Sequence, residues 1–233
     1  MMYLFDLDYT LIDSDELKKD MAVVIYGLNN GDVDARFKRD TDSCFKSQGK
    51  HYNLSDHLEY LIGCGAISKS RAERALTEMK LLLLNIDHYL KPGAEELVVK
   101  LFENGNKLVL MSYGDYEWQK MKIDGSQILH KYFQEKIIET VDKSQNQYFM
   151  NSLKRQDEIV IVNDKIEESL SMKHAIEALG AQCSVVIIKG PYSQHVDEKF
   201  ADKIKYMGDF QAFNGLINEK QGESRLPQEF KIK

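Results

Sequence analysis

The sequence predicts an α/β protein whose core is a doubly wound parallel sheet, with an all-helical segment inserted after the first strand. Two observations support this prediction. Apolar runs of strand length alternate with amphipathic helices over residues 91–220, and no convincing strand occurs in residues 14–90. Strands that alternate with helices require right-handed crossovers, which place the strands parallel in one sheet. The chain has 233 residues, enough to bury a core of this kind.

The first strand is predicted within the stretch YLFDLDYTLID, residues 3–13. Residues 3–5 form a short apolar run typical of buried parallel strands. Asp6 and Asp8 are predicted to share one face of an extended segment, because side chains alternate with a period of two. Two close carboxylates destabilise each other unless a cation or a shared proton relieves them. Taken alone, the pair is equally typical of a polar strand end before a helix.

Residues 14–90 are predicted to be helical and to form a separate domain. Ser70 and Glu73 fit a capping box in front of the sequence RAERALTEMKLLLLNIDHYL. The stretch SDHLEYLIGCG predicts a shorter helix that begins near Ser55 and ends at the glycines.

The predicted core consists of residues 1–13 and 91–220, and residues 221–233 are expected to form a polar tail. The first helix of the core after the insertion has Pro92 near its start and Gly105 after its end. The elements that follow are predicted as strand KLVLMS, a helix at 116–133, strand KIIETV, helix SQNQYFMNSLKRQ, strand EIVIVND, helix KIEESLSMKHAIEALG, strand CSVVIIK, a weak strand KIKYMG and helix FQAFNGLINEK.

The composition is that of an ordinary globular protein, with 43% hydrophobic and 29% charged residues. A net charge of −6 argues against electrostatic binding to nucleic acid or to acidic membranes. The sequence does not indicate the oligomeric state. The three cysteines form no C-x-x-C pair, which favours a reducing compartment. No signal peptide and no apolar run of spanning length is apparent, so a cytoplasmic location is expected.

Polar residues follow the apolar strands of the predicted sheet at their carboxyl ends. Because these ends converge on one rim of a parallel sheet, where ligands bind, an accidental coincidence is a poor explanation. The residues in question are Asp6, Ser112, Asp142 with Lys143, and Asp164.

This set of side chains suits phosphoryl transfer. Asp6 can act as a carboxylate nucleophile that forms an aspartyl-phosphate, and Asp8 as general acid and then general base. Asp164, together with Asp6, offers hard oxygen ligands to Mg²⁺. Ser112 and Lys143 can hold phosphoryl oxygens by a hydrogen bond and by charge. A metal and a phosphate between the two acids would explain why the acids occur together.

Four motifs carrying these residues resemble those of the haloacid dehalogenase (HAD) superfamily. FDLDYT is similar to motif I, and LVLMS, which ends on Ser112, is similar to motif II. Lys143 suits the lysine of motif III, and IVIVNDKIEES resembles motif IV with Asp164 as its leading acid. The resemblance implies a Rossmann-like core with a helical cap inserted between motifs I and II, at residues 14–90, that closes over the core.

The resemblance also implies roles for single residues. Asp6 would be nucleophile and Mg²⁺ ligand, and Asp8 would bind the metal through its backbone carbonyl. Asp164 would be a further ligand, with Glu167 or Glu168 assisting through water, and Glu168 is the one assigned here. Substrate-binding residues would be Thr10, Ser112, Tyr113 and Lys143. Dehalogenases of the superfamily lack the second acid of motif I, so Asp8 favours phosphate chemistry.

Three departures from the family pattern are present. Lys143 precedes Ser-Gln rather than Lys-Pro, so Lys136 is a lower-ranked substitute. Asn163 precedes Asp164, and Tyr113 stands where relatives often have asparagine. The sequence thus predicts a magnesium-dependent phosphatase of a small phosphorylated metabolite. A phosphomutase that uses the same acids and a non-catalytic HAD-like binding module are the alternatives.

Overall fold

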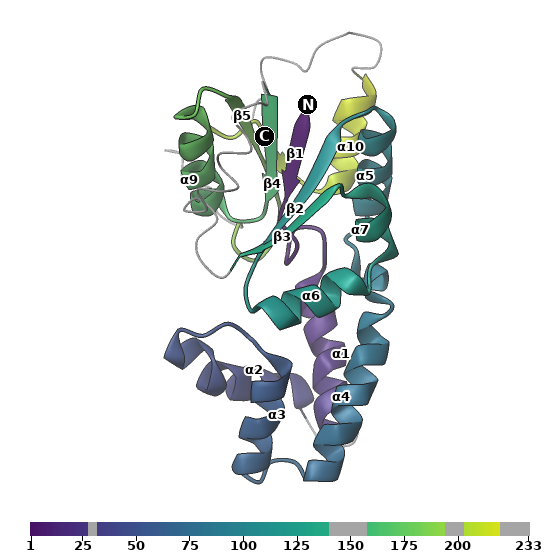
Figure 1. Ribbon diagram of the computed structural model, residues 1–233, viewed down its shortest axis with the longest axis vertical. Helices are drawn as coiled ribbons and strands as arrows, with labels where there is room; N and C mark the ends of the chain where they lie inside the picture. The colour runs from purple at the N-terminus through teal and green to yellow at the C-terminus, as the bar shows by residue number, and fades with distance from the viewer. Residues whose placement is uncertain (28–31, 140–157, 194–202, 220–233) are drawn as a thin grey trace. The chain divides into compact units, whose positions relative to one another are not determined.

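A computed structural model describes residues 1–27, 32–139, 158–193 and 203–219 (Figure 1). The predicted helix SQNQYFMNSLKRQ and the predicted polar tail at 221–233 lie outside these residues.

The chain divides into two compact units, which we describe separately. The core unit comprises Met1–Ile12, Leu90–Tyr113 and Ile128–Lys233, and the helical unit comprises Asp13–Tyr89 and Gly114–Gln127. The helical unit therefore contains a second segment, residues 114–127, which the sequence-based division placed with the core.

The described strands of the core unit form one sheet of six strands, all parallel, in the order β3-β2-β1-β4-β5-β6. From β1 in the interior, the chain adds strands first on one side and then on the other (Figure 1). This confirms the predicted doubly wound parallel sheet. The strands are β1 Met2–Phe5, β2 Lys107–Tyr113, β3 Glu135–Glu139, β4 Glu158–Asn163, β5 Gln182–Ile188 and β6 Tyr206–Gly208.

Helices cover both faces of the sheet, with α9 on one face and α5, α7 and α10 on the other (Figure 1). Their bounds are α5 Ala94–Glu103, α7 Gln127–Tyr132, α9 Ile166–Glu177 and α10 Phe210–Glu219. The start of α5 has no side-chain cap; Gly93 precedes it with φ 81°. A Cβ at Gly93 would approach the backbone nitrogen of Gln211 to 3.1 Å, so the glycine also permits close packing against α10.

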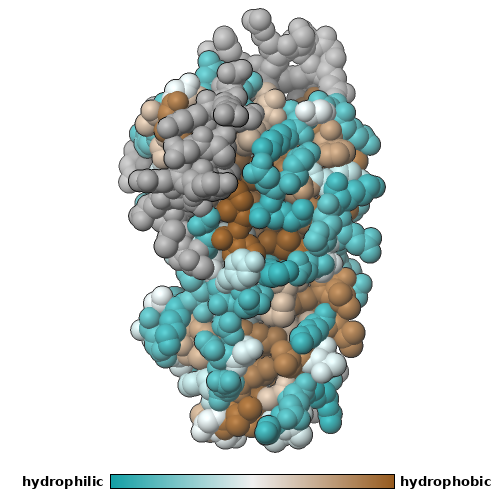
Figure 2. All heavy atoms as spheres, in the orientation of Figure 1, coloured by the Kyte–Doolittle hydropathy of each residue, from teal (hydrophilic) through white to brown (hydrophobic). Residues whose placement is uncertain are grey.

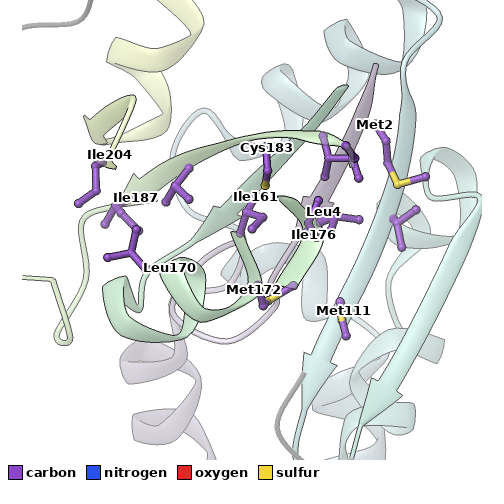
Figure 3. Close-up of a cluster of buried hydrophobic side chains, with 14 of the residues drawn as sticks. Met2, Leu4, Met111, Ile161, Leu170, Met172, Ile176, Cys183, Ile187 and Ile204 are labelled. Atoms are coloured by element: carbon purple, nitrogen blue, oxygen red, sulfur yellow. The ribbon is translucent and has the colours of Figure 1, made fainter. Parts of the chain in front are cut away.

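Alternate residues of the strands point to opposite faces, and this alternation builds the two halves of the core. On the α9 face, side chains from β1, β2, β4 and β5 meet the apolar side of the helix (Figure 3). This cluster includes Met2, Leu4, Met111, Ile161, Leu170, Met172, Ile176, Cys183 and Ile187. On the other face, the ring of Phe5 meets that of Phe133 edge-on, with centroids 5.6 Å apart.

The helical unit is built from short capped helices. They are α1 Ser14–Tyr26, α2 Val33–Cys44, α3 Leu54–Gly63, α4 Lys69–Leu83 and α6 Tyr116–Asp124, with the 3₁₀ turns η1 Lys46–Gln48 and η2 Ile86–Tyr89. Each of these α-helices is preceded by a polar residue whose side-chain oxygen accepts hydrogen bonds from backbone N–H groups of the first turn.

The predicted capping box at Ser70 and Glu73 is wrong. Helix α4 begins two residues earlier than that box requires, because Ser68 is extended (φ −78°, ψ 159°) and its hydroxyl accepts from the Arg71 N–H at 3.2 Å. Ser70 lies inside the first turn, where its hydroxyl meets that of Ser68 at 3.1 Å. Both Ser68 and Ser70 precede a helical sequence and could cap α4, and in the structure Ser68 is the cap.

Two N-terminal caps of the helical unit are joined to each other. Asn53 caps α3 and Asp115 caps α6, and the Asn53 amide donates to the Asp115 carboxylate at 3.0 Å. Beside this bond the rings of Tyr52 and Trp118 lie 4.9 Å apart. Trp118 is buried and Tyr116 is exposed. The buried Trp118 side chain therefore packs within the helical unit.

His57 is fully buried in the helical unit, among the rings of Phe37, Phe45 and Tyr52. Its Nδ1 lies 3.3 Å from the Tyr52 hydroxyl, and its Nε2 has no hydrogen-bond partner among the described residues. Burial lowers the pKa of His57 to about 4, and the nearby Asp40 opposes this shift only in part. The imidazole is therefore held neutral.

The helical unit exposes apolar side chains at its surface, where brown residues lie along α4 (Figure 2). Leu81 and Leu84, near the end of α4, are 59% and 63% exposed. Among the described residues no helix combines the length and the apolar character needed to cross a bilayer.

The burial of His57 predicts that acid destabilises the protein between about pH 6.5 and pH 4. In that window the unfolded chain binds a proton at His57 that the folded chain excludes, so the free energy of unfolding falls as the pH falls. The loss from this residue reaches up to about 3 kcal/mol. Urea denaturation of wild type and His57→Leu at several pH values measures it, and the variant should have a flatter profile.

The exposed His130 provides the matched control for this measurement. His130→Leu should retain the wild-type pH profile. Equal slopes for wild type and His57→Leu between pH 6.5 and 4 would show that His57 is not the group responsible.

Candidate active site

The polar residues predicted from the sequence gather where β1, β2 and β4 end. Phe5 pairs with Leu110 of β2 and with Val162 of β4, so these three residues form one row across the sheet. Asp6, Ser112 and Asp164 follow that row by one or two residues. The Asp6 N–H continues the ladder by donating to the Val162 carbonyl at 3.0 Å. The register thus brings three of the predicted residues to one stretch of the rim.

Beyond Asp6 the chain turns instead of continuing as a strand. The Leu7 carbonyl accepts from the N–H groups of Leu11 and Ile12, both at 3.0 Å, and Tyr9 adopts a left-handed conformation with φ 59°. The strand ends at Phe5, so the period-two argument that placed Asp6 and Asp8 on one face does not describe this segment. The turn brings Thr10 back toward the end of β4.

Thr10 lies between two carboxylates that are far apart in the sequence. Its buried hydroxyl is 3.4 Å from an Asp6 oxygen (Oδ2) and 3.5 Å from Asp164 Oδ1. A hydroxyl has one proton to donate, so it can serve only one of the two acids at a time. Two carboxylates therefore share one weak donor in a buried place.

Asp164 is fully buried, and its ionisation is costly. Burial first, and then the charge of Asp6, raise its pKa to about 7, while Lys165 and Lys91 oppose the shift. Its Oδ2 has no hydrogen-bond partner among the described residues. An unpartnered carboxylate oxygen in a dry site is expensive unless something positively charged meets it.

Asn163 organises the first turn after β4. Its side-chain oxygen accepts from the N–H groups of Asp164, at 2.8 Å, and Lys165, at 3.2 Å, while its amide donates to Glu168 at 3.1 Å. Glu168 also pairs with Lys165 at 3.7 Å, whereas Glu167 is exposed. Of the two glutamates considered from the sequence, Glu168 is thus the one connected to the Asp164 turn.

Ser112 lies within β2 and is 1% exposed. Its hydroxyl has no hydrogen-bond partner in the described part of the chain. Tyr113, the last residue of β2, is half-buried. A buried hydroxyl without a partner, near the end of the strand next to β1, is available to a ligand.

Lys143, the lysine predicted to bind phosphate, cannot be placed in the site, because it is not among the described residues. Its neighbour Asp142 also lies outside the described residues. The substitute considered from the sequence, Lys136, is near the amino end of β3, where it pairs with Leu110, two residues before the level of Ser112. Its ammonium donates to the Phe133 carbonyl at 2.9 Å. Lys136 therefore points its charge away from the rim.

Sequence reasoning did not identify two contributors to this rim. Lys91 donates from its ammonium to the carbonyls of Tyr9 and, at 3.0 Å, of Lys189. Tyr192, after β5, meets the Tyr9 ring edge-on at 5.3 Å, with the Lys165 ammonium 5.5 Å from its own ring. No local sequence motif predicts these contacts, because they join segments that are far apart in the chain. Only the order of the strands in the sheet could have suggested them.

The residues at the rim fit a magnesium ion, although they do not form a dense cluster of ligands. Within the described ranges no group of three or more His, Cys, Asp or Glu side chains is placed to bind a metal. Magnesium commonly uses one or two carboxylates and keeps several waters or substrate oxygens. Asp6 and Asp164 supply that number, and the unpartnered oxygen of Asp164 is a donor of the required type.

Comparisons with known proteins identify the fold through structure rather than through sequence. No family profile matches the sequence, and no curated protein has detectable sequence similarity to it. A protein assigned as a haloacid dehalogenase-like hydrolase from Burkholderia xenovorans LB400 superposes with a TM-score of 0.65 at 19% identity, over 94% of this chain and 96% of the other.

Two further structures agree with this result. A protein assigned as a β-phosphoglucomutase from Thermotoga maritima has a TM-score of 0.60 at 16% identity, covering 94% of this chain and 99% of the other. The HAD-hydrolase YfnB from Bacillus subtilis, bound to magnesium, has a TM-score of 0.59 at 16% identity, covering 93% and 98%. The chain therefore has the fold of the HAD-like hydrolases, as the motifs predicted.

The position of Thr10 predicts that its hydroxyl, not its size, stabilises the rim. In Thr10→Val the shape is kept but the two carboxylates lose their shared donor. The free energy of unfolding at pH 8 in EDTA should fall by about 1–3 kcal/mol. Thr10→Ser keeps the hydroxyl and is the control. A loss in Thr10→Ser as large as that in Thr10→Val would assign the effect to packing of the methyl group instead.

Proposed function

We propose that this protein is a magnesium-dependent phosphomonoester hydrolase that acts on a small phosphorylated metabolite through an aspartyl-phosphate. The observation that supports this most directly is the meeting of Asp6 and Asp164 at the Thr10 hydroxyl, with one Asp164 oxygen buried and unpartnered. Such a pair has a physical reason to exist if a cation and a phosphate are bound there.

Asp6 is the proposed nucleophile. One of its carboxylate oxygens attacks phosphorus, and the bond between phosphorus and the ester oxygen breaks, which leaves the phosphoryl group on Asp6. The backbone N–H of Asp6 is fixed to Val162 of β4, so the residue starts from the rigid end of a central strand. A nucleophile held in this way needs little reorganisation to reach the phosphorus.

Asp8 is the proposed general acid and base. It gives its proton to the leaving ester oxygen in the first step, and in the second step its carboxylate takes a proton from the attacking water. The water oxygen then bonds to phosphorus, and the bond from phosphorus to Asp6 breaks to release inorganic phosphate. Asp8 lies in the turn after β1, two residues from the nucleophile, and outside the regular strand.

Asp6, Asp164 and the Asp8 carbonyl are the proposed magnesium ligands, with Glu168 acting through water by way of the Asn163 turn. When bound, the ion supplies charge neutralisation for the carboxylates and for the phosphoryl oxygens. Asp164, whose pKa is raised to about 7, holds a proton at lower pH in the absence of the ion. Protons and magnesium therefore compete for the same oxygen.

Ser112 is proposed to donate its hydroxyl to a phosphoryl oxygen, because that hydroxyl is buried and has no partner among the described residues. Lys143 is proposed to add a positive charge, with Thr10 supporting the loop and Tyr113 contacting the substrate beside Ser112. The helical unit is proposed to act as the cap that selects the substrate.

Phosphate chemistry is preferred to cleavage of a carbon–halogen bond. Similar structures include a dehalogenase, with a TM-score of 0.57 at 13% identity, so the fold alone does not decide between the two reactions. Asp8 favours phosphate chemistry, because the departure of an alkoxide needs a proton donor whereas the departure of a halide does not.

The test of the proposal is the hydrolysis of phosphate esters by the purified protein. We expect phosphate release from an aryl phosphate in the presence of Mg²⁺ and none in EDTA, followed by a preferred substrate within a library of phosphorylated metabolites. Negligible rates under both conditions across the library would contradict the proposal. Isomerisation of a substrate faster than phosphate release would assign the protein as a phosphomutase, and binding of Mg²⁺ without turnover as a binding module.

Substitutions at the two acids of motif I should differ in kind. Asp6→Asn should abolish turnover, because an amide is a poor nucleophile and a weaker magnesium ligand. Asp8→Asn should lose about 10²- to 10⁴-fold in rate, the usual contribution of a general acid–base residue. Where the first step limits the rate, the loss should be smaller for an aryl phosphate than for an alkyl phosphate, because a good leaving group needs little protonation.

Steady-state kinetics with both esters, together with magnesium titration, measure these differences. Asp8→Asn should keep its magnesium affinity, because the proposed contact at Asp8 is a backbone carbonyl. Wild-type rates in Asp6→Asn would refute the nucleophile and the mechanism built on it.

A further inference from the structure

Tyr9 has an unusual backbone conformation for its residue type. Among the described residues it is the one non-glycine residue with positive φ, at 59°. A left-handed conformation brings Cβ close to the following carbonyl oxygen, and residues other than glycine, asparagine and aspartate seldom adopt it. Tyr9 is also the residue between Asp8 and Thr10, so its conformation sets the directions in which both of these side chains leave the loop.

Lys91 holds the Tyr9 loop at two points. Its ammonium donates a hydrogen bond to the Tyr9 carbonyl, and its backbone N–H donates to the Leu11 carbonyl at 2.8 Å. The two acceptors lie on either side of Thr10. The adjacent residue Leu90 forms a bridge with Ile12. Residues 90–91, where the chain returns to the core unit, thus bind the loop of residues 9–12 that follows β1.

The same ammonium reaches a third segment, the loop after β5. It donates to the Lys189 carbonyl at 3.0 Å, and the next residue, Gly190, lies against both the loop and the acid. A Cβ at Gly190 would be 3.4 Å from the Tyr9 carbonyl oxygen and 3.5 Å from Asp164 Oδ2. The buried Ser193 hydroxyl accepts from the Gly190 N–H at 2.9 Å, which fixes the conformation of this second loop.

These contacts place one half-buried ammonium between the loops that follow two strands, β1 and β5. A charged donor bound to backbone carbonyls makes a stronger hydrogen bond than a neutral one, so it can hold a conformation that the backbone disfavours. We propose that Lys91 is a positioning residue of the active site: its ammonium keeps Tyr9 left-handed, and in this way it fixes the orientation of Asp8 and Thr10. For its effect on rate, this inference rests on the proposed function.

A double-mutant cycle between Lys91 and Tyr9 tests the proposal. Glycine adopts positive φ without strain, so Tyr9→Gly removes the need for a residue that enforces it. Lys91→Met in the Tyr9 background should lower kcat on an aryl phosphate by about 10²-fold with little change in KM, the cost of a misplaced catalytic group. In the Tyr9→Gly background the same substitution should leave kcat as it is in Tyr9→Gly alone.

Thermal unfolding in EDTA provides a readout that does not depend on activity. Lys91→Met should lower Tm by about 2–4 °C in the Tyr9 background and by less in the Tyr9→Gly background. Lys189→Met is the matched control, because it removes an exposed charge from the neighbouring segment but keeps the carbonyl that Lys91 contacts. Its kcat and Tm should equal those of wild type.

Equal losses on Lys91→Met in both backgrounds would overturn the proposal, because Lys91 would then act without Tyr9. If wild type has no phosphatase activity, the proposed function fails and the Tm cycle alone decides on Lys91. Should Lys91→Met not fold, Lys91→Gln, which retains an N–H donor on a shorter side chain, enters the same cycle. Its predicted loss is smaller in size and has the same dependence on Tyr9.

Discussion

The repulsion between a buried and a half-buried carboxylate, Asp164 and Asp6, is the constraint around which the rim of this sheet is arranged. Asp6 and Asp164 come from neighbouring strands and meet at a single hydroxyl that cannot satisfy both. Two neighbouring cations partly offset this repulsion: Lys165 and Lys91 lower the pKa of Asp164 against the effects of burial and of Asp6. One oxygen of Asp164, Oδ2, is left without a hydrogen-bond partner among the described residues. A stable apolar sheet beneath is what allows such an arrangement to persist.

The packing of that sheet fixes the positions of its strand ends. Alternate residues of β1 and β4 pack against α9 on one face, while Phe5 contacts Phe133 on the other. With both faces filled, the strand ends have little freedom, and the positions of the polar groups follow from the register. The turn from Leu7 to Ile12 departs from regular strand structure, and backbone hydrogen bonds within the turn and from Lys91 hold it, together with the Lys91 ammonium.

Much of the fold could be predicted because it depends on local patterns. The apolar runs around β1, β2, β4 and β5 were readable from the sequence, and so were the polar residues at the ends of β1, β2 and β4, which parallel pairing brings together. The start of α4 could not be read, because Ser68 and Ser70 both suit a cap and only the backbone conformation selects one. The membership of α6 in the helical unit depends on the bond from Asn53 to Asp115, which joins distant segments.

The residues of the candidate site also fall into two groups, those that local patterns indicate and those that depend on contacts between distant segments. Asp6, Ser112 and Asp164 were found because each sits at a strand end, and motif patterns describe such positions well. Lys91 was missed because its partners are backbone carbonyls, which every residue has, so no residue type marks them. The left-handed Tyr9 was missed for a related reason: tyrosine carries no preference for that conformation, and its surroundings impose it.

The interior place of β1 also has a consequence for how the chain is made. Met2 pairs with Lys107 on one side and with Ile159 on the other, so β1 is synthesised well before either of the two strands that flank it. Closing such long loops is slow, whereas the helical unit between them relies mostly on contacts near in sequence. Until β4 arrives, an apolar N-terminal strand has an open edge and no second neighbour. A nascent or truncated chain is therefore most prone to aggregation in this interval, and its first strand is the segment that a chaperone would have to shield.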